Sequence, residues 1–182
     1  MKVKETEFEG LYILEPAVFG DSRGFFMESF NAKVLEKAGL VANFIQDNQS
    51  FSTAGVLRGL HYQSAPYAQT KLVRVLSGVI LDVIVDLRRE QPTFGKSFTI
   101  ELSSENKRQL YVPKGFAHGF SVLGESAEIL YKCDNYYHRE AEGGILYNDP
   151  ALGIDWKLPE DKIVLSEKDA RNPLMADATF KF

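Results

Sequence analysis

Short segments in which apolar and polar residues alternate recur along most of this chain, and they constrain its fold more than any other feature. Alternation places every second side chain on one face, which is typical of strands with one buried face. Turn residues separate the segments, for example at Gly20-Asp21, Gln91-Pro92 and Leu123-Gly124. The predicted strands cover residues 11–14, 25–30, 44–51, 56–63, 71–76, 79–87, 97–102, 109–112, 118–123 and 128–135.

Helix signals are few. Asn31 is a suitable N-cap for a short helix ending near residue 38, and Ser166 for another ending near residue 170. The Ser77-Gly78 step between two strong strands predicts a hairpin turn. Many strands with close turns and few helices predict an all-β sandwich or barrel with a few short peripheral helices.

The 182 residues match the length of one domain, so we expect residues 1–182 to form a single one. Hydrophobic residues make up 45% of the chain, which supplies a core and excludes disorder. The net charge of −4, without any basic run, disfavours a nucleic-acid or membrane partner. A single cysteine excludes a disulfide framework. Because residues 1–10 lack a secretory signal and the apolar run 79–85 is too short to cross a bilayer, we expect a cytoplasmic protein.

One acidic residue interrupts the most apolar predicted strand. Asp82 shares its face with Ile80 and Ile84, so it either marks a solvent face or is buried beside a partner. On the preceding strand, Lys71 shares its face with Val73. We expect Asp82 and Lys71 to form a charged pair inside the barrel.

The predicted strand over residues 56–63 carries Arg58 and His61, whose positions have opposite parity. Gly59 lies between them, where a bulge would bring both side chains to one face. The alternative is that Gly59 marks only a close approach of two backbones and that Arg58 lies outside. His61 alone does not decide between a structural and a catalytic role.

His118 follows a Pro-x-Gly turn, an arrangement that resembles the small barrels called cupins, in which such a histidine can bind a metal. Those metal sites also need a His-x-His pair and a glutamate on an earlier strand. Here Gln63 stands where the second histidine would be, and residues 65–70 contain no acid. We therefore expect a cupin-like barrel without a metal.

The remaining inventory points to proton chemistry. The chain has no glycine-rich phosphate loop, no nucleophile elbow and no base beside Cys133 in the sequence. Imidazoles, carboxylates, the phenol of Tyr131 and the ammonium group of Lys71 are what a cofactor-free cavity could use as acids, bases and cations.

Several motifs occur together in the order of one known family: 19–26 (FGDSRGFF), 46–48 (QDN), 57–61 (LRGLH), 71–74 (KLVR), 92–95 (PTFG), 113–120 (PKGFAHGF), 131–133 (YKC) and 165–169 (LSEKD). This closely resembles the dTDP-4-dehydrorhamnose 3,5-epimerases, over residues 10–175. The resemblance implies a cupin-like jelly roll that needs no cofactor and acts as a homodimer. It also implies the inversion of C3 and C5 in dTDP-4-dehydro-6-deoxy-D-glucose, a step of dTDP-L-rhamnose biosynthesis for cell-surface polysaccharide.

The resemblance also implies roles for individual residues. His61 matches the base, paired with Asp169, and Lys71 matches the cation beside the C4 oxygen. Tyr131 matches the acid that returns a proton to the opposite face of the ring. A half-buried strand aromatic would be the simpler interpretation of Tyr131 without that resemblance.

The implied nucleotide-sugar contacts include Arg58 on the same subunit and Arg23 and Glu28 from the partner subunit. Phe19 is a plausible stacking partner for thymine. Turn-exposed charge and core packing are the simpler alternatives for Arg23 and Phe19. The remaining predicted contacts are Gln46, Asn48, Asp82, His118, Glu142 and Lys168.

Three other interpretations stay open from the sequence. A relative could epimerise only C3 or only C5, or act as a ketoisomerase, with the same barrel and base. A non-catalytic sugar-binding module would need only the cavity. A metal-dependent oxygenase would need the histidine and glutamate that the chain lacks.

Overall fold

The computed structural model describes residues 1–182 and consists mainly of strands, which confirms the all-β prediction. The helical elements are one short helix and three single 3₁₀ turns. The strands are β1 (Lys2–Glu5), β2 (Tyr12–Glu15), β3 (Val18–Asp21), β4 (Gly24–Met27), β5 (Gln46–Thr53), β6 (Leu57–Gln63), β7 (Lys71–Asp86), β8 (Ser97–Ser103), β9 (Gln109–Val112), β10 (Phe116–Cys133) and β11 (Glu142–Gly144). The helical elements are α1 (Ala32–Lys37), η1 (Arg139–Ala141), η2 (Glu160–Lys162) and η3 (Asp169–Arg171).

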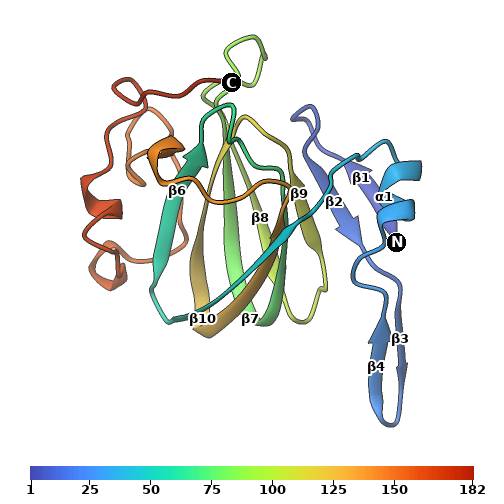
Figure 1. Ribbon diagram of the computed structural model, residues 1–182. Coiled ribbons are helices and arrows are strands. Elements are labelled where there is room, and N and C mark those ends of the chain that lie inside the picture. The colour runs from blue at the N-terminus through green and yellow to red at the C-terminus, as the bar shows by residue number, and fades with distance from the viewer.

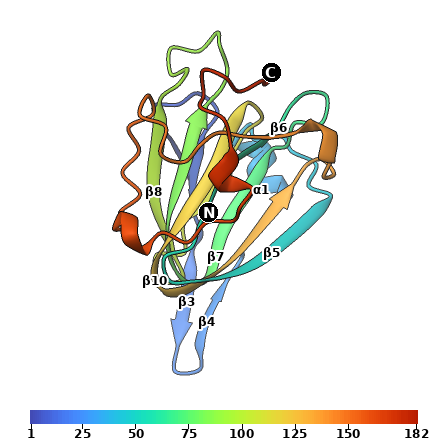
Figure 2. The same ribbon diagram turned by 90° about the vertical axis from the view of Figure 1, so that its left-hand side faces the viewer.

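The two longest strands, β7 and β10, form the centre of the barrel and pair with each other in antiparallel fashion. The other edge of each of these strands pairs with two different strands in turn. The first part of β7 pairs with β9 and the second part with β8, whereas β10 pairs first with β6 and then with β5. Because the partners diverge, the sheet splits and curls around an interior, as Figures 1 and 2 show.

The predicted hairpin at Ser77-Gly78 is wrong, because β7 continues through it. Gly78 adopts φ +79 opposite Ala127, at a point where the register between β7 and β10 shifts. The glycine therefore bends the strand and does not reverse it. The predicted turn at Leu123-Gly124 is wrong for a related reason. Residues between Val122 and Ala127 bulge out of the ladder, and β10 resumes beyond them.

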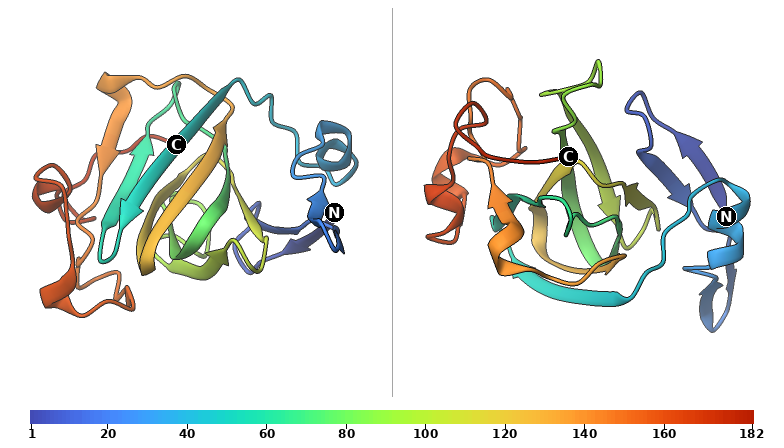
Figure 3. Two further views of the ribbon diagram at one scale, coloured as in Figure 1. Left: turned by 90° about the horizontal axis from the view of Figure 1, so that it is seen from below. Right: turned by 45° about the horizontal axis from the view of Figure 1, so that its top comes forward.

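The N-terminal region contributes two strands that the alternation did not predict, β1 and β3. Strands β3 and β4 pair only with each other and form a hairpin that projects from the body of the protein (Figure 1). The N-terminal strands and the C-terminal segment lie on opposite sides of the barrel (Figure 3). The predicted cap of α1 is confirmed, since Asn31 Oδ1 accepts from the backbone N–H groups of Lys33 and Val34.

The core has three clusters, and the two largest lie inside the barrel and under the C-terminal segment. In the first, inward residues of β7 such as Val73, Ile80 and Ile84 pack on Phe8 and Phe116. In the second, Leu60 and Trp156 are among the buried residues. No helix in the structure combines the length and apolar character that a membrane crossing requires.

Candidate active site

A cavity of about 190 Å³ lies inside the barrel, and its wall is unusually rich in ionisable groups. A second hollow of about 300 Å³ shares Arg58 and His61 with it and extends along the 164–169 segment. The two hollows therefore meet at β6. The ionisable side chains that line the first cavity are Arg58, His61, Lys71, His118 and Tyr131.

The bulge predicted at Gly59 is confirmed, and it explains how two residues of opposite parity reach one cavity. His118 of β10 is opposite His61, and Phe120 is opposite Arg58, so β6 contains one more residue than β10 between these pairs. A Cβ atom at Gly59 would lie 2.6 Å from Cα of Gly119, so any residue other than glycine would clash there. The alternative is correct about the close approach of two backbones at Gly59, but wrong in leaving Arg58 away from the cavity: this exposed side chain lines it.

His61 and Asp169 form a dyad at the boundary between the two hollows. Nε2 of His61 lies 2.6 Å from Oδ1 of Asp169, and the aspartate is 3% exposed. Burial alone would raise the pKa of Asp169, but hydrogen bonds from His61 and from the Gly59 N–H outweigh it and hold that pKa below its usual value. The carboxylate therefore stays ionised, fixes the tautomer of His61 and leaves Nδ1 as the nitrogen able to accept a proton.

The 3₁₀ turn η3 positions Asp169 for this contact. Ser166 Oγ accepts from the Asp169 N–H at 3.1 Å, but the prediction that Ser166 is the N-cap is wrong, because the N-cap of this single 3₁₀ turn is Lys168. A contact across 108 residues of sequence follows from packing of the C-terminal segment on β6, which local patterns do not reveal.

Tyr131 and Lys71 face the same cavity from the paired strands β10 and β7. Nζ of Lys71 lies 5.8 Å from the centre of the Tyr131 ring. Burial raises the pKa of Tyr131, so the phenol keeps its proton and is available as an acid. Burial lowers the pKa of Lys71, while the nearby Cys133, Asp82 and Glu142 oppose that shift. A phenol, an amine and an imidazole thus line one cavity.

Asp82 is buried inside the barrel with 0% exposure, so its alternative as a solvent-face residue is wrong. Its partner is His118 and not Lys71 as predicted: Oδ1 of Asp82 lies 2.6 Å from Nε2 of His118. Parity correctly placed Asp82 and Lys71 on inner faces, but the two residues lie eleven positions apart on the same strand, β7, and no salt bridge joins them. His118 instead lies on the adjacent strand β10, two residues before Phe120, which is the register partner of Asp82. Asp82 is not among the residues that line the cavity.

Further predicted contacts gather on one side of the cavity. Glu142 Oε2 lies 2.5 Å from Nζ of Lys168 and accepts from the hydroxyl of Tyr137 at 3.0 Å. Although burial would raise it, the pKa of Glu142 is lowered by these two bonds. Tyr137 is 56% exposed and was not predicted from the sequence. The consecutive tyrosines Tyr136 and Tyr137, which begin three residues after the end of β10, are the signal that could have indicated it.

Gln46 and Asn48 lie on β5 beside the cavity. Asn48 is the register partner of Tyr131, and it accepts from the Gln46 amide at 3.0 Å. Its own amide lies 3.7 Å from Sγ of Cys133. Arg58 Nε donates to Ser52 Oγ at 3.1 Å, which directs the guanidinium along the same edge. These side chains form a polar margin next to the cavity.

Three predicted residues lie away from this cavity in the same chain. Phe19 and Arg23 belong to the projecting β3–β4 hairpin, where Phe19 is 66% exposed and Arg23 is bonded to Asp21. Glu28 follows β4 and accepts from the Asn31 amide. A single chain therefore does not unite these residues with His61.

Comparison with known proteins agrees with the geometry. A sequence model of the family described as dTDP-4-dehydrorhamnose 3,5-epimerase matches residues 5–177. A relative of that name from Shigella flexneri is 54% identical over 181 residues, covering 99% of both chains. The solved enzyme of that name from Elizabethkingia anophelis is 53% identical, covers 97% of both chains and has a TM-score of 0.93.

A second solved structure contains a ligand. A dTDP-6-deoxy-D-glucose-3,5-epimerase from Legionella pneumophila, solved with dTDP-4-keto-L-rhamnose, is 49% identical with a TM-score of 0.94. The match covers 100% of this chain and 98% of that one. Together the comparisons confirm the predicted family and the cupin-like jelly roll.

Proposed function

The chain belongs to the dTDP-4-dehydrorhamnose 3,5-epimerase family, an isomerase family, and we propose that its catalytic centre is the cavity lined by His61, Lys71 and Tyr131. The reaction inverts C3 and C5 of dTDP-4-dehydro-6-deoxy-D-glucose and gives dTDP-4-dehydro-L-rhamnose. The observation that supports this assignment is the meeting of a base, a phenolic acid and a cation around one cavity.

Both reacting carbons flank the C4 ketone, so loss of either proton gives an enolate. His61 accepts the proton through Nδ1, and the ionised Asp169 stabilises the imidazolium that forms. Lys71 donates to the C4 oxygen, where negative charge develops. Tyr131 supplies a proton from the opposite side of the ring, which converts exchange into inversion. Each step uses a side chain of the cavity wall and requires no electron transfer.

The nucleotide part needs cations and polar groups outside the reacting centre. Arg58 lies at the mouth of the cavity and pairs with the diphosphate. Gln46 and Asn48 contact the nucleotide from β5, and Glu142 and Lys168 contact the ligand from the opposite side. His118 contacts the sugar.

The chain acts as a homodimer in this proposal, because Phe19, Arg23 and Glu28 reach the cavity of the partner subunit. The exposed aromatic face of the projecting hairpin, with Phe19 at 66% and Phe26 at 69% exposure, supports an intersubunit role. Arg23 adds charge for the diphosphate, and Phe19 stacks on thymine. The enzyme works in the cytoplasm, and its product supplies rhamnose for cell-surface polysaccharide.

Mixed dimers test the shared site. Arg23→Ala and His61→Asn homodimers should each have low activity at low substrate concentration. If Arg23 acts on the partner's cavity, a heterodimer of the two variants has one intact site and one doubly altered site. Random pairing in a 1:1 mixture makes about half of the dimers heterodimers, so the mixture regains roughly a quarter of wild-type activity. A mixture as inactive as its parents would show that Arg23 acts within its own chain.

Incubation with dTDP-4-dehydro-6-deoxy-D-glucose in D₂O, followed by NMR, tests the reaction itself. Solvent deuterium at C3 and C5 with inversion at both carbons is the expected result. Deuterium at one carbon would indicate a single-site epimerase, and no deuterium would indicate a binding module. A His61→Asn variant should retain dTDP binding and lose deuterium incorporation at both carbons.

A further inference from the structure

Two His–Asp dyads face the same cavity, and the proposed mechanism uses only one of them as a base. In both, Nε2 of the histidine lies 2.6 Å from Oδ1 of an aspartate. His118 and Asp82 form the second dyad, with exposures of 8% and 0%. Burying such an ionisable pair costs desolvation free energy, which only good geometry and additional hydrogen bonds offset.

Asp82 has an acceptor that remains free. Its Oδ2 is buried and has no hydrogen-bond partner, although a carboxylate can accept several hydrogen bonds. The negative charge of Asp82 acts on Lys71, another wall residue of the same cavity, and opposes the lowering of its pKa by burial. One carboxylate behind the wall thus supports two nitrogen donors that line it.

Resting on the proposed function, we propose that Asp82 is a positioning residue that holds His118 and Lys71 as a pair of donors for the C4 oxygen of the sugar. Nε2 of His118 is committed to Asp82, and the proposed role as a donor requires a proton on Nδ1 as well, which histidine carries in its imidazolium form. Two donors aimed at one developing oxyanion match the need of an enolate better than Lys71 alone. Asp82 itself does not touch the sugar.

The proposed role predicts how the loss of Asp82 affects exchange at each of the two carbons. The C4 oxygen carries the negative charge whether the proton leaves C3 or C5. Loss of a donor pair for that oxygen therefore slows both exchanges by the same factor. A group that serves one carbon would change the ratio of deuterium at C3 to deuterium at C5.

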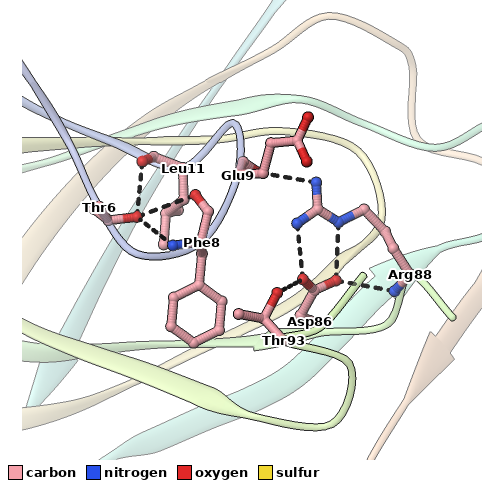
Figure 4. A network of polar contacts seen from close by, with 7 residues as sticks. All are labelled: Thr6, Phe8, Glu9, Leu11, Asp86, Arg88 and Thr93. Carbon is pink, nitrogen blue, oxygen red and sulfur yellow. Dashed lines mark hydrogen bonds and ion pairs between the residues drawn. The ribbon is translucent and has the colours of Figure 1, made fainter. Parts of the chain in front are cut away.

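The test compares Asp82→Asn with Asp86→Asn. Asp86 is a matched control, because it lies on the same strand, is also 0% exposed and bonds to Arg88 and Thr93 outside the cavity (Figure 4). Asp82→Asn should lower kcat about 10²–10³-fold, the usual effect of losing an oxyanion donor, with equal slowing at C3 and C5 and unchanged dTDP affinity. Asp86→Asn should lower the melting temperature and leave kcat at the wild-type value.

The pH profile separates support of Lys71 from a purely structural role. Without the charge of Asp82, burial lowers the pKa of Lys71 further, so the alkaline limb of kcat/KM moves to lower pH. Asp82→Glu keeps the charge and should keep the limb in place, even where the altered length lowers kcat. The other groups around Lys71, which stay unchanged in these variants, are Arg58, His61, His118, Tyr131, Cys133 and Glu142.

A double variant connects Asp82 to His118. If Asp82 acts through His118, the combined loss in Asp82→Asn/His118→Gln is at least tenfold smaller than the product of the single losses. Independent effects, an unmoved alkaline limb or an altered C3-to-C5 ratio would each overturn the proposal. If Asp82→Asn does not fold, His118→Gln alone must slow both exchanges equally. Deuterium incorporation by the wild type tests the proposed function separately, so the two failures are distinguishable.

Discussion

Replacing Asp169 with asparagine tests whether the carboxylate prepares His61 as a base. The substitution keeps the shape of the side chain but removes its charge, and the new amide can donate where the carboxylate accepts. In the wild type, the 2.6 Å contact makes Nε2 of His61 the protonated nitrogen and leaves Nδ1 free. An amide that donates to Nε2 would move the proton to Nδ1, which could then no longer accept one from the sugar.

The expected loss follows from two effects that act together. A correctly placed base contributes about 10²–10⁴-fold to a rate. The corresponding Asp-to-Asn change in the serine protease triad costs about 10⁴-fold in kcat because it favours the wrong tautomer. Asp169 is 3% exposed, so water cannot replace the missing charge. We therefore expect kcat to fall about 10³–10⁴-fold, or about 4–5.5 kcal/mol of transition-state stabilisation, with KM changed only a few-fold.

The assay is deuterium incorporation at C3 and C5 in D₂O, followed by NMR under initial-rate conditions. Asp155→Asn is the matched control, since Asp155 is exposed, contacts Lys157 and lines neither of the two hollows. Binding of dTDP, measured by calorimetry, should be equal in both variants and the wild type. A folded Asp169→Asn enzyme whose kcat stays within tenfold of wild type would refute the idea that Asp169 sets the tautomer of His61.

Three further outcomes are expected. Tyr131→Phe should still exchange deuterium into the sugar but lose at least about 10²-fold in inversion, which NMR distinguishes by product configuration. Lys71→Met should slow exchange at both carbons about 10²–10³-fold in the same assay. Burial would raise the pKa of Asp86, but bonds from Arg88 and Thr93 lower it, so its stabilisation is present at neutral pH and lost as pH falls below its unfolded pKa of about 4. The free energy of unfolding, measured with urea between pH 7 and pH 3, should thus fall less steeply for Asp86→Asn than for the wild type.

The sequence predicted the parts of the site that depend on strand parity. The positions of Asp82 and Lys71 relative to their apolar neighbours placed them inside, and Gly59 correctly indicated the bulge that unites Arg58 with His61. What parity cannot supply is which inward residues meet. That depends on register between strands, and it made His118 the partner of Asp82 in place of Lys71.

Contacts made by the C-terminal segment were beyond local patterns for a different reason. Asp169 reaches His61 from a single 3₁₀ turn, which has no periodicity to recognise, and only the family resemblance indicated the pairing.

The sequence also does not show whether a glycine within a strand pattern marks a turn or a bulge. At Gly78 a positive φ fits a hairpin turn as well as a bulge, and only the long-range pairing of β7 with β10 decides between them.

The bend at Gly78 can be tested by comparing alanine at two glycines with nearly equal φ. Gly78 has φ +79, and a Cβ there would lie 2.0 Å from the carbonyl oxygen of Ser126. Gly39, the residue after the C-cap of α1, has φ +76, and a Cβ there meets nothing within 4 Å. Gly39→Ala therefore reports the conformational cost alone, about 1–2 kcal/mol.

Gly78→Ala adds a clash with backbone that belongs to the central β7–β10 pair, so neither strand can yield without losing register. We expect a loss of at least about 3–4 kcal/mol in the free energy of unfolding by urea, beyond the range of ordinary substitutions. Because the bend lies between Lys71 and Asp82 on β7, the surviving fold should also lose kcat. Equal destabilisation by the two alanines would mean that the strands separate freely at Gly78, and the bend would then not fix the spacing of the two charged residues.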